Sequence, residues 1–228
     1  MKAPGLMWSR SQLSEHTATD KYGPRMARTR GLSWLGAAGA ISFVVVFLVN
    51  DAVRPDYDPV RDFVSEAAIG AGGWVQIANF IFTGCLLAFS SAALSTTAGR
   101  WTGILVALVG VSLIAAGVFV SDPAPHDRAT WHGIAHNVVS AVVFASLSAA
   151  CFVAARWRPT PMWRWYCRAT GFAVPIMFVT AGADANASGL WQRLTIVAGW
   201  SWLAVLSLRA LRSPAPVDDR AAHVPLGH

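Results

Sequence analysis

The sequence predicts an all-α membrane protein, a bundle of six transmembrane helices, and three observations support this. Hydrophobic residues make up 54% of the 228 residues and charged residues only 13%, whereas soluble domains carry about 25% charged residues. The mean hydropathy is +0.45. Apolar stretches also recur that approach the ~20 residues a helix needs to cross about 30 Å of hydrocarbon.

Each apolar stretch predicts one membrane helix. The first is too long for the apolar region of a cleavable signal peptide, and no cleavage site of small residues follows it, so we expect an uncleaved helix. The fifth is the shortest and contains Pro175, which neighbouring helices can accommodate. In the third, Gly103, Gly110 and Gly117 recur on one stripe, which predicts a helix-packing face. The six stretches are Leu32 to Asn50, Trp74 to Ser95, Gly103 to Val120, His132 to Ala155, Ala169 to Ala183 and Leu190 to Leu208.

The basic residues predict the orientation of the chain. With six spans, the two tails, the Thr96 to Thr102 turn and the Arg156 to Arg168 connector share one side. The N-terminal tail holds six basic residues, the C-terminal tail three, the turn one and the connector four. Together these segments carry fourteen of the 18 basic residues in the chain. By the positive-inside rule, both termini are cytoplasmic in a multi-pass protein of the plasma membrane.

The net charge of +6 does not indicate nucleic-acid binding, because the cations form a collar beside the membrane. Such a collar favours membrane lipids with anionic headgroups on the cytoplasmic side. We expect one membrane domain over residues 31–209. The polar segments 1–30 and 210–228 lack apolar periodicity, which predicts disordered cytoplasmic tails.

The outer connections hold the candidate functional residues. In the loop from Arg54 to Glu66, apolar residues favour a short interfacial helix that would orient Asp62, Ser65 and Glu66. Near the fifth and sixth stretches lie Asp184, Gln192 and Arg193. Since a cation at the membrane boundary needs a carboxylate, we expect Arg193 to pair with Glu66, Asp122 or Asp184.

A polar face in the second stretch includes Gln76 and Asn79 near the outer end. Hydrogen bonds between helices would account for it. The alternative is a polar path that leads inward from the outer mouth, with Asn79 among the ligand-binding residues. The ligand-binding candidates are therefore Asp62, Asn79, Asp184, Gln192 and Arg193.

The densest group of ionisable residues runs from Ser121 to His136. His132 and His136 are spaced i, i+4, which puts both rings on one face of a helix. With Asp122 and His126 they could hold a zinc ion with an open position that activates water, while Ser65, Glu66 and Asp122 serve as catalytic groups. The alternatives are a hydrogen-bonded structural cluster and a site that binds a ligand or a proton.

Several motifs together resemble one membrane family. They are Tyr57-Asp58-Pro59, Phe63-Val64-Ser65-Glu66, Gly117-Val118-Phe119 before Asp122-Pro123, His132-Gly133-Ile134-Ala135-His136 and Gly189-Leu190-Trp191-Gln192-Arg193. The set resembles the bacterial and archaeal family catalogued as domain of unknown function 998, over about Leu32 to Leu208. The resemblance implies a six-helix membrane protein and supplies no settled activity.

Three classes of function follow from these observations. The first is a protein whose outward-facing polar pocket binds a lipid or small ligand. The second is a zinc-dependent membrane hydrolase acting on a lipid or amide. By residue type, Ser65, Asp122, His132 and His136 are similar to the metal centre of the superfamily that includes alkaline ceramidases. The third is a small proton-coupled transporter, for which no matched pair of broken helices is apparent.

Overall fold

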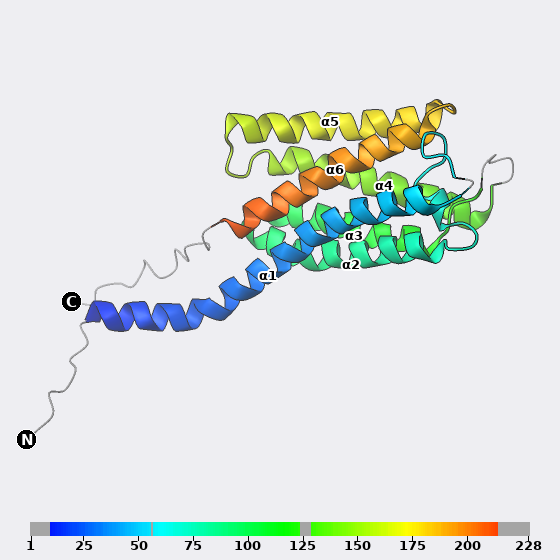
Figure 1. Cartoon of the computed structure of the whole chain (residues 1–228). Helices are drawn as coiled ribbons and strands as arrows, with labels where there is room; N and C mark the ends of the chain where they lie inside the picture. The colour runs from blue at the N-terminus through cyan, green and yellow to red at the C-terminus, as the bar shows by residue number, and fades with distance from the viewer. Residues whose placement is uncertain (1–9, 56, 124–128, 214–228) are drawn as a thin grey trace, which may run out of the picture.

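The computed structural model describes residues 10–55, 57–123 and 129–213, with side chains from residue 27 onward. Within these ranges it contains six α-helices, one short 3-10 helix and no strand (Figure 1). The six helices predicted from the apolar stretches are therefore confirmed. The elements are α1 (Arg10–Val53), η1 (Glu66–Ala68), α2 (Trp74–Thr97), α3 (Arg100–Val118), α4 (Trp131–Ala154), α5 (Pro161–Ala183) and α6 (Ser188–Leu211).

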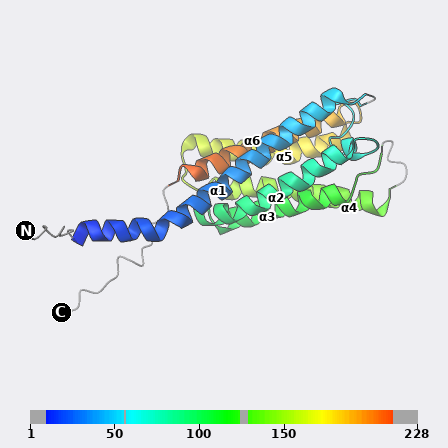
Figure 2. The ribbon, with the colours of Figure 1, turned by 60° about the horizontal axis from the view of Figure 1, so that its bottom comes forward.

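The helices form a closed bundle in which α6 is the most central. Each helix packs against its neighbour in sequence, and α6 returns to α1. It also contacts α2 and α4, so that Trp200, Trp202 and Leu203 are fully buried. Figures 1 and 2 show α6 between α1 and α5, with its C-terminal end at the same end of the bundle as the beginning of α1.

Five helices are long and apolar enough to cross a membrane, namely α1 from Ala27, α2, α3, α4 and α6. The exception, α5, has 23 residues and would span ~35 Å at about 1.5 Å per residue. Its first turns carry Arg164 and Arg168, which lower its hydropathy. The predicted stretch Ala169 to Ala183 is its apolar portion, and Pro175 lies inside the helix.

The small residues of α3 form the packing face that the sequence predicts. A Cβ atom on Gly110 would lie 2.6 Å from the carbonyl oxygen of Gly84 in α2, and a Cβ on Gly84 would lie 2.6 Å from that of Gly110. One residue before the end of α3, Gly117 similarly faces the backbone of Ile77. The α2 and α3 backbones therefore approach each other at glycines, as is common between membrane helices.

One boundary of the membrane domain differs clearly from the sequence-based expectation. The first helix begins at Arg10, although residues 1–30 were expected to form a disordered tail. The last helix ends at Leu211, close to the predicted limit of the membrane domain, and residues 214–228 lie outside the described ranges.

The predicted interfacial helix in the first loop is wrong in position. Residues 57–65 form turns, and the only helical turn of this loop among the described residues is η1, which begins at Glu66. Val64, expected to face the interface, is 1% exposed and belongs to the core. The reason is that the loop folds back over the bundle and buries Val64, Ala67 and Ala68 there, while Val60 stays exposed.

The glycine contact gives a test of the packing. We expect Gly110→Ala to lower the free energy of unfolding in detergent by about 1–3 kcal/mol, because the new methyl group meets backbone atoms that cannot rotate away. Gly31→Ala is the matched control. No atom lies within 4 Å of its new Cβ, so helix propensity should stabilise it by up to about 1 kcal/mol. Equal stabilities of the two variants would contradict the close approach of α2 and α3.

Candidate functional site

The end of the bundle opposite the termini is organised around Arg193, whose side chain is 9% exposed. Its Nε donates to Asp51 Oδ2 at 2.8 Å, and its Nη2 donates to the hydroxyl of Tyr57 at 2.7 Å. Its Nη1 donates to the carbonyl oxygens of Asp62 and Gly189, at 2.8 and 3.0 Å. Since the helix dipole disfavours a cation near the N-terminus of α6, the carboxylate at the end of α1 supplies the necessary countercharge.

The predicted partner of Arg193 is therefore wrong, because Asp51 takes the place expected for Glu66, Asp122 or Asp184. The Asp51 side chain is 8% exposed and lies in the last turn of α1. Packing of α1 against α6 brings the two charges together. Residues so far apart in the sequence cannot be matched from their local patterns.

Two of the three carboxylates predicted to pair with Arg193, Asp184 and Glu66, accept hydrogen bonds from other groups. Asp184, which caps the end of α5, accepts hydrogen bonds from the indole N–H of Trp191 and the backbone N–H of Asn186, both at 3.1 Å. Glu66 Oε2 accepts from the backbone N–H of Phe63 at 2.7 Å. These carboxylates organise the ends of helices and the turns between them.

Tyr57 connects Arg193 to the loop. Its hydroxyl accepts from Arg193 and donates to the carbonyl oxygen of Phe63 at 2.8 Å. Burial raises the pKa of Tyr57 well above its ordinary value, against the opposing effect of the Arg193 charge. The phenol therefore stays protonated and keeps its donor role. The nearby Asp62 carboxylate accepts from the backbone N–H of Asp58 at 2.7 Å, on the exposed side of the loop.

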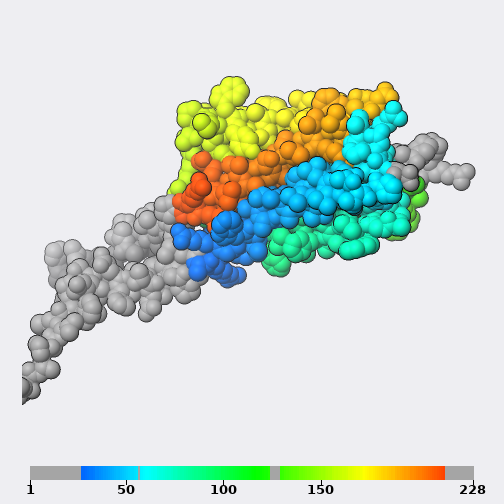
Figure 3. All heavy atoms as spheres, viewed as in Figure 1, coloured from blue at the N-terminus to red at the C-terminus, as the bar shows by residue number. Residues whose placement is uncertain are grey.

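The 57–73 loop is bound to the first turn of α6. The backbone N–H of Val64 donates to Gln192 Oε1 at 2.6 Å. In return, the N–H groups of Gly189 and Leu190 donate to the carbonyl oxygens of Arg61 and Val60, at 3.2 and 2.9 Å. The loop thus satisfies N–H groups that a helix N-terminus leaves without partners. Figure 3 shows the cyan loop lying against the beginning of α6.

The end of α1 holds the same loop from its other side. Arg54 donates to the carbonyl oxygen of Ile69 at 2.8 Å and also to that of Ala67. Both η1 and the turn after it are thereby fixed to α1. The loop consequently has two anchors, one on α1 and one on α6.

Beneath the loop lies a cavity of about 30 Å³, enough for a water molecule or a group of a few heavy atoms. Most of its lining is apolar and includes Phe43, Phe80 and Phe144. Its polar lining comes from the loop and two helices: Ser65 in the loop, His136 and Ser140 in α4, and Gln192 and Trp200 in α6. Three of the candidate residues, Ser65, His136 and Gln192, are therefore brought together.

His136 has a defined proton position. It is 4% exposed, and its Nδ1 lies 2.7 Å from the carbonyl oxygen of Phe119 and 3.1 Å from that of Ala116. Because a carbonyl can only accept, Nδ1 carries the proton, and in the neutral ring Nε2 is then an acceptor. The same contacts satisfy carbonyl groups at the C-terminal end of α3.

His132 and Asp122 belong to the beginning of α4 and not to the cavity. His132 Nδ1 lies 3.1 Å from the carbonyl oxygen of Val120. Asp122 accepts from the backbone N–H and the hydroxyl of Thr130, at 2.8 and 2.5 Å, and Thr130 caps α4 through the N–H of Gly133. A side chain on Gly133 would collide with the Asp122 carboxylate. This arrangement matches the hydrogen-bonded cluster that the sequence left open.

The expected zinc ligands do not converge in the described part of the chain. There, no group of three or more His, Cys, Asp or Glu side chains is placed to hold a metal ion. His132 is 3.9 Å from Asp122 through its Nδ1, while His136 directs its Nδ1 toward α3. His126 lies outside the described residues, so its role remains a prediction.

The polar face of α2 is buried within the bundle. Asn79 donates to the carbonyl oxygen of Phe43 in α1 at 3.1 Å and to Gln76 Oε1 at 3.5 Å. Gln76 is fully buried. These contacts support the interhelical hydrogen bonding that the sequence suggested, and Asn79 does not line the cavity.

Sequence reasoning missed several residues of the site, among them Asp51, Arg54 and Trp200. Asp51 and Arg54 end the first apolar stretch, and Trp200 lies in the middle of the last one. A charge at the end of a membrane helix is common, so Asp51 and Arg54 gave no distinct signal. In the sequence, Trp200 has the pattern of a core aromatic residue. It does pack in the core, where its ring stacks on Phe43 with a centroid distance of 5.0 Å.

The buried ion pair can be tested by a double-mutant cycle. We expect Asp51→Asn and Arg193→Met each to lower the free energy of unfolding by about 3–5 kcal/mol, since each leaves one buried group without its partner. The double variant should lose less than the sum, by about 0.5–3 kcal/mol. The control is Arg61→Gln, because Arg61 is 68% exposed and 3.8 Å from Asp58; it should change stability by about 1 kcal/mol or less. Additive losses would rule out coupling between Asp51 and Arg193.

Comparison with known proteins agrees with the resemblance drawn from the motifs. The model of the family described as "Protein of unknown function (DUF998)" matches residues 37–209, which covers nearly all of the six-helix bundle. No curated protein and no solved structure is significantly similar to the chain. Because the family match extends over more than half of its length, the chain belongs to the DUF998 family of proteins of unknown function.

Proposed function

We propose that this multi-pass protein binds the polar end of a lipid or of another small amphipathic ligand in the cavity beneath the 57–73 loop. The observation that carries the proposal is Trp200. Its indole N–H is buried and has no hydrogen-bond partner, and the residue lines the cavity. Buried indole N–H groups normally find an acceptor, so a bound group would supply the acceptor that Trp200 lacks.

The chemistry of the lining suits such a ligand. Aromatic and aliphatic side chains provide most of the surface, and a few polar groups converge on it, as in typical small-molecule sites. The 57–73 loop forms one wall through Val64 and Ser65. Movement of this loop away from α6 would open the cavity, at the cost of the Val64 to Gln192 hydrogen bond.

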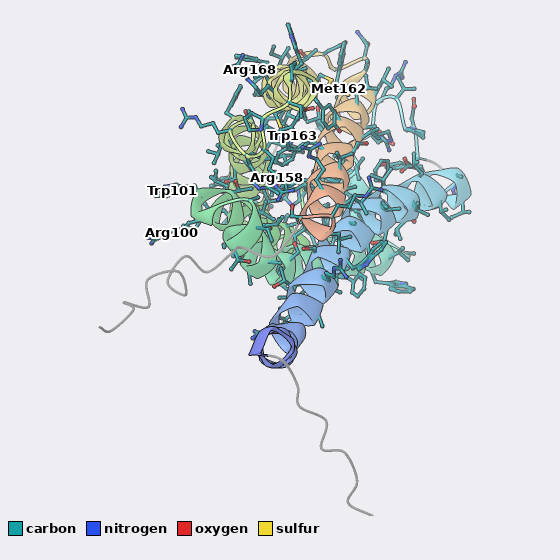
Figure 4. The ribbon with its side chains drawn as sticks, turned by 90° about the vertical axis from the view of Figure 1, so that its left-hand side faces the viewer. Arg100, Trp101, Arg158, Met162, Trp163 and Arg168 are labelled. Atoms are coloured by element: carbon teal, nitrogen blue, oxygen red, sulfur yellow. The ribbon has the colours of Figure 1, made fainter. Side chains whose placement is uncertain are left out.

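The distribution of charge supports an outward-facing cavity in the plasma membrane, with both termini cytoplasmic. Every acidic side chain that the structure describes lies at the cavity end of the bundle. Arginines gather at the opposite end, where Figure 4 shows Arg100, Arg158 and Arg168 around the bundle. The exposed Trp101 and Met162 lie beside them. Under the positive-inside rule this basic end is the cytoplasmic one, and its arginines would contact anionic headgroups.

A cavity-filling variant tests the binding. We expect Ser140→Leu to reduce the lipid that remains bound per protein after detergent purification, because its larger side chain occupies the cavity. Ala141→Leu, on the exposed side of the same helix, is the matched control and should retain as much as the unmodified protein. Mass spectrometry of the extracted lipid measures both. Identical lipid content in the three proteins would refute the proposal.

A second candidate is hydrolysis of an ester, and the observation that favours it is that Ser65 and His136 line the same cavity. With its proton on Nδ1, His136 presents Nε2 as a base, and serine hydroxyls become nucleophilic beside such a base. The two side chains need not touch before a substrate binds, since catalytic hydrogen bonds often tighten only in the complex. In this reaction the nucleophile is a serine, and no metal ion is required.

Labelling by a fluorophosphonate tests this candidate. We expect the reagent to modify Ser65, and His136→Asn to slow the modification about 100-fold or more, in the range typical of general-base catalysis. Ser140→Ala is the control, because it removes the other hydroxyl of the cavity and should leave labelling intact. Peptide mapping identifies the modified residue. Absence of a label on Ser65 in folded protein would exclude the serine hydrolase.

A further inference from the structure

We infer that the group bound in the cavity is an uncharged O–H group at the end of an apolar chain, such as the hydroxyl of a fatty alcohol. This inference rests on the proposed binding function and specifies its ligand. A hydroxyl both donates and accepts hydrogen bonds, and the cavity offers partners for each role. Three features of the lining carry the inference. His136 offers an acceptor nitrogen, Trp200 and Gln192 offer N–H donors beside the hydroxyls of Ser65 and Ser140, and no Asp, Glu, Lys or Arg is among the described lining residues.

The acceptor is His136. Its Nδ1 proton is directed to the carbonyl oxygens of Phe119 and Ala116, which leaves the Nε2 lone pair for a ligand. Phe80 packs edge-on against the imidazole, with a centroid distance of 6.2 Å. The α3 contacts therefore fix the tautomer of His136. A ligand with an O–H group can then donate a hydrogen bond to Nε2.

The donors are Trp200 and Gln192. The Trp200 N–H is buried without a partner. Gln192 uses its oxygen to accept from the backbone of Val64, so its amide N–H groups are the part that remains to donate. A ligand oxygen could accept from either donor while its proton goes to His136.

Charge selects against anionic headgroups. No Asp, Glu, Lys or Arg side chain of the described residues lines the cavity. The nearby guanidinium of Arg193 is already bound to Asp51, Tyr57 and two carbonyl groups. A phosphate or carboxylate would be buried here without a countercharge, which is strongly unfavourable. The volume of about 30 Å³ also admits only a small polar head.

Three probes with the same C18 chain separate these features. Oleyl alcohol donates and accepts, methyl oleate only accepts, and oleyl phosphate is anionic. With purified protein in nanodiscs of fixed lipid composition, we expect oleyl alcohol to raise the unfolding temperature at the lowest concentration. Methyl oleate should bind about tenfold more weakly because it leaves His136 without a donor. Oleyl phosphate should bind more weakly still.

Two variants test which side chain accepts a hydrogen bond from the ligand and which donates one to it. An asparagine at position 136 can keep a donor near the Nδ1 position but lacks the Nε2 acceptor, so His136→Asn should bind the alcohol and the methyl ester equally. Trp200→Phe keeps a ring of similar packing and removes the donor, so it should weaken both probes about tenfold and preserve the ratio between them. His132→Asn, outside the cavity lining, is the control and should change neither affinity. If His136→Asn does not fold, the probe series on the unmodified protein and on Trp200→Phe still decides the outcome.

The results distinguish the inference from the function on which it rests. Equal affinities of the unmodified protein for oleyl alcohol and methyl oleate would overturn the inference while leaving lipid binding intact. A larger effect of oleyl phosphate would overturn it as well. If none of the probes shifts the unfolding temperature, and Ser140→Leu retains as much lipid as the unmodified protein, the cavity holds only water and the proposed function also fails.

Discussion

The buried guanidinium of Arg193 is the constraint on which the cavity end of this protein depends. Arginine keeps its charge at any accessible pH, so burial near a helix N-terminus requires a carboxylate and acceptors for the remaining N–H groups. Asp51 supplies the charge, while Tyr57 and the carbonyl groups of Asp62 and Gly189 supply the acceptors. One side chain thereby joins α1, α6 and the loop between α1 and α2. The loop can close over the bundle because this cluster holds it there.

The same demand for hydrogen-bond partners explains the histidines of α4. At the end of α3 the carbonyl groups lack helical partners, and a membrane offers little water to replace them. His132 and His136 provide N–H donors from the neighbouring helix. The spacing that could have indicated a metal site thus places one ring above the other along the end of α3. For His136, this structural role also leaves Nε2 as an acceptor on a residue that lines the cavity.

Two adjacent residues of α6 connect the loop to the proposed binding cavity. Arg193 and Gln192 are adjacent, yet they serve different ends: Arg193 organises the loop, and Gln192 contacts both the loop and the cavity. Opening the cavity must disturb the loop contacts of both residues. In the proposed function, the stability of the loop and the access of a ligand are therefore coupled through α6. Arg193 and Asp51 pair outside the cavity lining, so they add no charge to it.

The sequence alone determined the class of protein, its six helices, the small-residue face of α3 and the gathering of polar residues at one end. Composition and apolar periodicity are properties of short segments, which is why they could be read without knowing the fold. The tertiary structure decided which residues meet. Asp51 and Arg193 are 142 positions apart, and the Val64 to Gln192 contact spans 128. No local pattern distinguishes Asp51 from the other carboxylates as the partner of Arg193. The packing of α1 against α6 makes that choice, because a buried charge pairs with whichever opposite charge the neighbouring helix brings within reach.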